Sequence, residues 1–107
     1  MMRLLSIIIL AALLVGADSD PPGTEVIVAF TRTRFEPATV EVRRGTRVTF
    51  HNMDAGADTY SIVASDGSFE SRPLGRGGEW THRFLNAGEH EYFVKEHPET
   101  KGKAIVE

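Results

Sequence analysis

Apolar residues recur at every second position in several short runs between residues 25 and 107, and turn-forming residues separate these runs. Val26, Val28 and Phe30 follow this alternation in the first run, and Val48 and Phe50 follow it in a later one. A period of two places alternate side chains on opposite faces of a strand, whereas a helix requires a period of about 3.6. No helical period longer than one turn is present. The pattern therefore restricts the chain to a fold built from strands.

These runs predict about seven or eight short strands, punctuated by turn signals. The clearest turns are Arg44-Gly45-Thr46, Ser65-Asp66-Gly67 and Asn86-Ala87-Gly88. Each strand has one apolar and one polar face, which is typical of antiparallel sheets with one solvated side. We predict an all-β fold, an antiparallel Greek-key β-sandwich, over residues 25–107.

The N-terminus has the order of a secretory signal. Charged Arg3 precedes an apolar run from Leu4 to Val15, and small residues lead to Ala17. A run of about a dozen residues is short for a membrane-spanning helix, which needs roughly twenty. Because polar, turn-forming residues begin at Asp18, we expect a cleaved signal peptide; an uncleaved anchor is the alternative.

The expected organisation is a signal peptide over residues 1–17, a flexible lead-in over 18–24 and one domain over 25–107. This domain would be exported to the periplasm, the cell surface or the extracellular space, with no membrane attachment after cleavage. The formal net charge of −3 provides no basic surface for nucleic acid. We expect a monomer whose protein partner the sequence does not identify.

The chain contains no cysteine. An exported domain of this size without a disulfide depends on its core alone for stability. The absence of cysteine also excludes a thiol nucleophile, a thiolate metal ligand and a redox disulfide. No glycine-rich phosphate loop, HExxH motif or nucleophile elbow is present, so we expect no enzyme.

Several segments follow one another in a specific order. They are FEPATV from Phe35, GTRVTFHN from Gly45, DGSFES from Asp66, GEWTHRF from Gly78, GEHEYFV from Gly88 and HPETKG from His97. Together these segments resemble the cupredoxin family, the small copper-binding sandwiches that include plastocyanin and halocyanin-like proteins. The resemblance covers roughly residues 25 to 107 and implies the same sandwich fold.

The resemblance also implies a ligand set for copper: two histidine nitrogens, one cysteine thiolate and a weak axial methionine. In this sequence Val94 stands at the cysteine position, His97 at the second histidine and Thr100 at the methionine. Valine has no donor atom, and a neutral hydroxyl is a poor ligand for soft copper. A type 1 copper site is therefore excluded on chemical grounds.

Two alignments compete for the position of the first histidine. When the family pattern is counted forward from Asn52, the first histidine position falls on Asp58. When it is counted back from Asp66, the position falls on Tyr60. We prefer Tyr60, because Ile62 then takes the apolar position two residues further on. The Tyr60 ring would fill the copper cavity and direct its hydroxyl to His97 or to solvent.

Each of the four histidines could have a role other than binding type 1 copper. His97, with Glu96, Glu99 or Asp58 nearby, could bind Zn²⁺ or Cu²⁺ loosely through nitrogen and oxygen. His51 is expected to be solvated and His82 to be a buried, hydrogen-bonded structural residue. His90 would face His82 across a simple hairpin, unless the two strands belong to different sheets.

The sequence therefore predicts an exported, non-blue binding or accessory module without type 1 copper. One alternative is metal handling through His97 with nearby carboxylates or another histidine. A second alternative is copper electron transfer with the missing ligands supplied by a partner.

Overall fold

The computed structural model describes residues 24–107. The expected signal peptide and nearly all of the lead-in lie outside these residues. The strands are β2 (Glu25–Phe30), β3 (Phe35–Glu36), β4 (Thr39–Val42), β5 (Arg47–Asn52), β6 (Ile62–Ala64), β7 (Glu79–Arg83), β8 (Gly88–Val94) and β9 (His97–Val106). Among the described residues no helix is long and apolar enough to cross a membrane.

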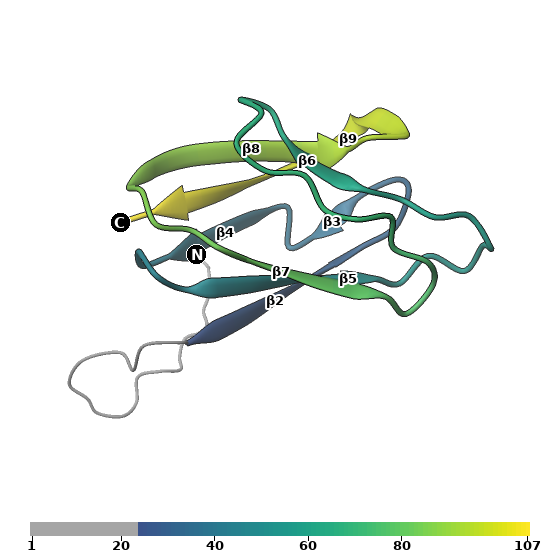
Figure 1. The fold of residues 1–107 in the computed structure, drawn as a ribbon, viewed down its shortest axis with the longest axis horizontal. Coiled ribbons are helices and arrows are strands. Elements are labelled where there is room, and N and C mark those ends of the chain that lie inside the picture. The colour runs from purple at the N-terminus through teal and green to yellow at the C-terminus, as the bar shows by residue number, and fades with distance from the viewer. Residues whose placement is uncertain (1–23) are drawn as a thin grey trace.

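The strands form two four-stranded sheets that pack face to face (Figure 1). One sheet has the order β3-β2-β5-β7 and the other the order β4-β9-β8-β6. The chain changes sheets between β3 and β4, between β4 and β5, between β5 and β6, between β6 and β7, and between β7 and β8. The predicted all-β sandwich is confirmed.

Both sheets are mixed rather than purely antiparallel. Strand β2 runs parallel to β5, and β4 runs parallel to β9, whereas the remaining pairs are antiparallel. Alternation of apolar residues reveals which face of a strand is buried, but it carries no information about the direction of the neighbouring strand. The sequence therefore predicts the buried faces of the strands correctly. It does not predict the parallel pairing of β2 with β5 or of β4 with β9.

The core lies between the two sheets and is formed by the alternating apolar residues. Phe50 of one sheet and Tyr92 of the other meet edge to face, with ring centroids 5.0 Å apart, and Phe35 meets Tyr92 at the same distance. Such edge-to-face pairs add to the stabilisation from burial. The aromatic residues therefore join the two sheets at the centre of the sandwich.

Gly102 of β9 pairs with Tyr92 of β8 and makes room for this aromatic contact. A Cβ at position 102 would lie 2.7 Å from Tyr92 Cε1 and 3.1 Å from the Phe35 ring. The glycine is therefore required by the close approach of two rings, one from each sheet.

The Tyr92 hydroxyl is buried without a hydrogen-bond partner among the described residues. Burial raises the pKa of Tyr92 well above its ordinary value of 10.0. An unpaired buried hydroxyl costs free energy relative to its hydrated state.

We expect Tyr92→Phe to stabilise the protein by about 1 kcal/mol at neutral pH, because it removes the unpaired hydroxyl and keeps the ring. The difference should widen above a pH of about 10, where the hydroxyl ionises in the unfolded chain but stays protonated in the folded one. Urea unfolding of both proteins between about pH 7 and about pH 11 measures this. A less stable variant, or a difference independent of pH, would contradict the burial of this hydroxyl.

Candidate functional site

The residues at three of the family's ligand positions lie on one hairpin. Val94 ends β8 and His97 begins β9, and the turn between them consists of Lys95 and Glu96. The Lys95 amide donates to the Ser61 carbonyl at 2.8 Å. In return, the Ser61 amide donates to Glu96 Oε1 at 2.9 Å. These two bonds hold the turn against the chain that leads into β6.

Val94 is fully buried and pairs with Ile62 across β6 and β8. Its isopropyl group is part of the apolar core, at the point where the family resemblance would place a thiolate. Valine offers no lone pair to a metal, and Thr100 offers a neutral hydroxyl. The residues present therefore do not fit type 1 copper.

Tyr60 is buried beside His97, with ring centroids 5.6 Å apart, whereas Asp58 is exposed. The Tyr60 hydroxyl donates a long hydrogen bond of 3.5 Å to Asp54 Oδ2. The sequence predicts that this hydroxyl points to His97 or to solvent, and the structure corrects that prediction: its partner is Asp54. Burial raises the pKa of Tyr60, and the charges of Asp54 and Asp58 add to the shift.

Asp54 is fixed by the backbone around it. Its carboxylate accepts hydrogen bonds from the amides of Arg32 and Gly56, each at 3.0 Å. These two bonds, that of Arg32 first, lower the pKa of Asp54. Its own amide donates to Asn52 Oδ1 at 2.8 Å. Asp54 therefore presents a fixed negative charge to the Tyr60 hydroxyl.

Thr100 is buried, and its hydroxyl donates to the carbonyl of Arg32. The backbone of Arg32 therefore serves both sides of the site, with its amide on Asp54 and its carbonyl on Thr100. A chain of hydrogen bonds runs from Tyr60 through Asp54 and Arg32 to Thr100. Two substituted ligand positions are thus tied to each other and to the loop after β2.

Sequence reasoning missed Asp54 and Arg32 as members of this site. The pattern Asn52-Met53-Asp54 could have indicated Asp54, since Asn and Asp side chains commonly bond to backbone amides two residues further on. Both Asn52 and Asp54 make this bond, to Asp54 and to Gly56. Arg32 contributes through its backbone, so its residue type carries no signal.

His97 is the one retained ligand position, and its side chain is 34% exposed. Its Nδ1 lies 3.8 Å from Glu99 Oε2, whereas the nearby Glu96 is engaged by the Ser61 amide. Within residues 24–107 no three His, Cys, Asp or Glu side chains are grouped so that they could hold a metal ion. Metal binding at His97 stays a prediction.

His51 is half-buried, and its Nδ1 lies 3.6 Å from Glu79 Oε2 across β5 and β7. The expected solvated side chain therefore has an acidic neighbour. This single carboxylate beside one imidazole resembles the arrangement at His97 and offers a matched comparison for metal titrations.

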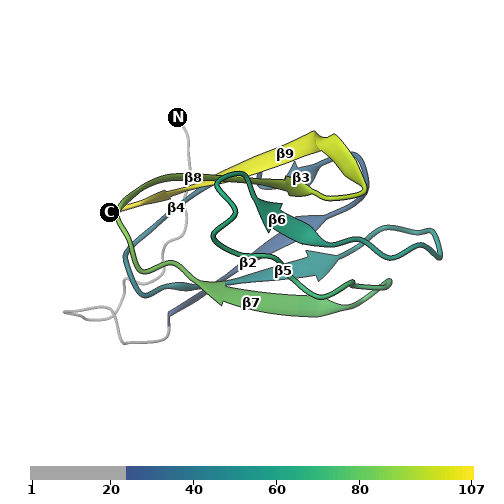
Figure 2. The same cartoon turned by 45° about the horizontal axis from the view of Figure 1, so that its top comes forward.

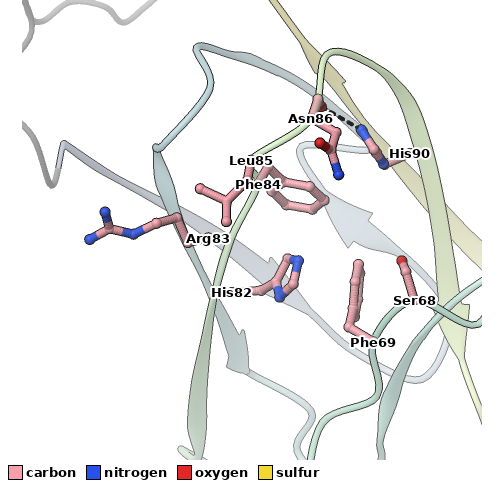
Figure 3. A pocket seen from close by; sticks show the side chains of 8 residues that line it. All are labelled: Ser68, Phe69, His82, Arg83, Phe84, Leu85, Asn86 and His90. Carbon is pink, nitrogen blue, oxygen red and sulfur yellow. Dashed lines mark hydrogen bonds between the residues drawn. The ribbon is translucent and has the colours of Figure 1, made fainter.

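His82 and His90 belong to different sheets, which excludes the simple hairpin between them. Both line a cavity of about 170 Å³ that also includes Phe69 and Phe84 (Figure 3). The His82 ring is half-buried. Its centroid lies 4.1 Å from that of the Phe69 ring and 4.8 Å from that of the Phe84 ring. Burial lowers the pKa of His82, and the nearby charge of His90 adds to this effect.

The His82 ring makes none of the expected hydrogen bonds within residues 24–107. It contacts the rings of Phe69, Trp80 and Phe84 instead. His90 does have such a bond, with 2.8 Å between its Nε2 and the carbonyl of Asn86. Sequence alternation indicates that His82 faces inward, but it does not distinguish a polar partner from an aromatic one.

Comparison with solved structures finds proteins with the same fold. A novel purple cupredoxin from Nitrosopumilus maritimus is 29% identical, with a TM-score of 0.62 over 68% of this chain and 81% of that one. An oxidised amicyanin variant is 22% identical, with a TM-score of 0.69 over 77% of this chain and 81% of its own. The Cu(I) form of another amicyanin variant is 22% identical, with a TM-score of 0.65 over 84% and 87% of the two chains.

No curated protein matches the chain at a significant level. A family model described as "Cupredoxin-like domain" matches residues 4–106, nearly the whole chain. The match agrees with the two-sheet topology and with the order of the segments along the chain. The chain therefore belongs to the cupredoxin-like domain family.

Proposed function

We propose that this protein is an exported binding or accessory module that keeps the cupredoxin fold without type 1 copper and without enzymatic activity. The observation that carries the proposal is the complete burial of Val94 at the thiolate position. Copper of the blue type requires a thiolate, and the chain has no cysteine. At the substituted ligand positions, Val94 is part of the core, and Tyr60 and Thr100 form hydrogen bonds.

The end of the sandwich around this site supports a role in binding. The turn at Lys95 and Glu96 is anchored to Ser61, and Thr100 is anchored to the loop after β2. Met53 is 57% exposed next to the fixed carboxylate of Asp54. A rigid rim with one exposed apolar side chain and acidic neighbours suits a protein partner, because little ordering entropy remains to be lost on binding.

Metal handling through His97 is the second candidate function. Its support is the exposure of His97 and the carboxylate of Glu99 at 3.8 Å. One imidazole with a mobile carboxylate gives no fixed coordination geometry. Electron transfer through copper would require a partner to supply the thiolate, which makes it a property of a complex.

We expect the triple variant Val94→Cys, Thr100→Met and Tyr60→His to acquire blue copper on addition of Cu²⁺. The three changes restore the thiolate, the axial sulfur and the first imidazole beside the retained His97. The wild-type protein should remain colourless under the same conditions. Absorption spectroscopy measures the outcome through the intense thiolate-to-copper band.

The matched control replaces Val94→Cys by Val94→Ser in the same triple variant, which keeps the geometry but removes the thiolate. This control should bind copper without the intense band. A second control carries Asp58→His in place of Tyr60→His. Colour in this second control alone would contradict the placement of Tyr60 at the first histidine position, and a blue wild-type protein would contradict the proposal itself.

Calorimetric titration of the wild-type protein with Cu²⁺ and with Zn²⁺ should show no stoichiometric binding. His97→Ala should behave like the wild type, because one half-exposed imidazole does not hold a metal tightly. His51→Ala is the matched control, since His51 also has one nearby glutamate. One equivalent of bound metal that is lost in His97→Ala and kept in His51→Ala would establish metal handling instead.

A further inference from the structure

Strand β7 lies at the edge of its sheet, because β5 is its only neighbour among the strands of residues 24–107 (Figure 2). The Asn52 amide donates to the Gly78 carbonyl at 2.9 Å, and the Phe84 amide donates to the Thr46 carbonyl at 3.2 Å. In an antiparallel ladder such bonded residues alternate with residues whose amide and carbonyl point away. The latter set in β7 consists of Glu79, Thr81 and Arg83.

This edge is accessible for pairing with another strand. The side chains of Glu79, Thr81 and Arg83 are exposed. Among the described residues, the one hydrogen bond recorded on the outward backbone groups comes from Arg72, whose Nη2 donates to the Glu79 carbonyl at 2.8 Å. Arg72 is itself exposed, so a competing amide can displace its guanidinium.

Strand β7 carries one negative and one positive side chain at equal distances on either side of Thr81. Glu79 lies two residues before Thr81, and Arg83 lies two residues after it. Charged residues on an edge strand usually oppose pairing with other chains. Here an antiparallel second copy centred on the same threonine would place Glu79 opposite Arg83 at both ends, so the charges favour that one pairing.

We propose that β7 pairs antiparallel with β7 of a second copy of this chain, centred on Thr81. This register joins the two sheets into one continuous sheet through a two-fold axis. Thr81 faces Thr81 and Glu79 faces Arg83, and these are the residues whose backbone groups point outward. Trp80 then lies opposite His82 of the second copy, in the closely spaced type of pair.

The surroundings of Arg83 favour a negatively charged partner. In the ladder with β5 it lies directly opposite Arg47, and like charges in opposed positions are unfavourable. No ion pair is recorded for Arg83 among residues 24–107, and its side chain points away from the neighbouring cavity (Figure 3). Glu79 of the second copy supplies an opposite charge.

Other pairings lose this complementarity. A shift by two residues places Glu79 or Arg83 opposite Thr81 and removes both ion pairs. A parallel arrangement in register brings Glu79 close to Glu79 and Arg83 close to Arg83. The antiparallel register centred on Thr81 is the one that matches both the charges and the outward backbone groups.

The contact is small, so the dimer is weak. Three outward-facing pairs provide up to roughly six main-chain hydrogen bonds, and interfaces of this size belong to transient complexes. We expect dissociation constants between about 10 µM and about 1 mM, which are compatible with a monomer at low concentration. The inference refines the monomer expected from sequence.

Sedimentation velocity of the 107-residue chain tests the proposal at concentrations up to about 1 mM and low salt. The wild type should show reversible dimerisation, and Glu79→Arg or Arg83→Glu alone should weaken it at least about tenfold. An equimolar mixture of the two single variants should dimerise again. In that mixture, the variant with arginine at both positions faces the variant with glutamate at both positions.

Two further measurements separate this outcome from misfolding or from another interface. Glu41→Arg changes the charge equally on an exposed position of β4 and should dimerise like the wild type. The Thr81 and Arg83 amides should gain protection from hydrogen exchange as the concentration rises. A wild type that stays monomeric at about 1 mM, single variants that dimerise normally, or a mixture that stays monomeric would each overturn the proposal.

Discussion

The packing of Val94 against Ile62 is the contact on which the rest of this site depends. The family resemblance implies a thiolate at the end of β8, and this chain has there an apolar side chain with no exposed surface. Two of the neighbouring positions take part in packing and hydrogen bonding. Tyr60 fills space beside His97, and Thr100 bonds to the backbone of Arg32.

Hydrogen bonds connect two of the substituted ligand positions, Tyr60 and Thr100. Asp54 and the backbone of Arg32 link Tyr60 to Thr100. Charge-assisted bonds from backbone amides keep Asp54 ionised and in place. These bonds connect the loop after β2, the loop after β5 and strand β9 at this end of the sandwich.

The sequence predicted the parts of this structure that depend on residue type and local alternation. The strands, the buried faces and the substitutions at positions 94 and 100 are of this kind. It did not reveal the parallel pairing of β2 with β5, because direction depends on the path of the chain between them. It also missed Arg32, since a backbone group acts regardless of its side chain.

The side chains of His82 and Tyr60 also show which features the sequence predicts and which it does not. His82 was correctly placed on an inward face, but its aromatic neighbours come from other segments, and alternation within one strand does not predict them. The sequence predicts the wrong partner for the Tyr60 hydroxyl, because Asp54 contacts it from a loop. Contacts between segments far apart in sequence limit what can be predicted here.

The most direct test of the central claim is the free energy of unfolding of Val94→Ala, measured in urea without added metal. If Val94 is core, removal of two buried carbons and the resulting cavity should cost about 2 kcal/mol. A loss below about 0.5 kcal/mol, as for an exposed position, would show that this side chain is not packed and would contradict a site converted to core.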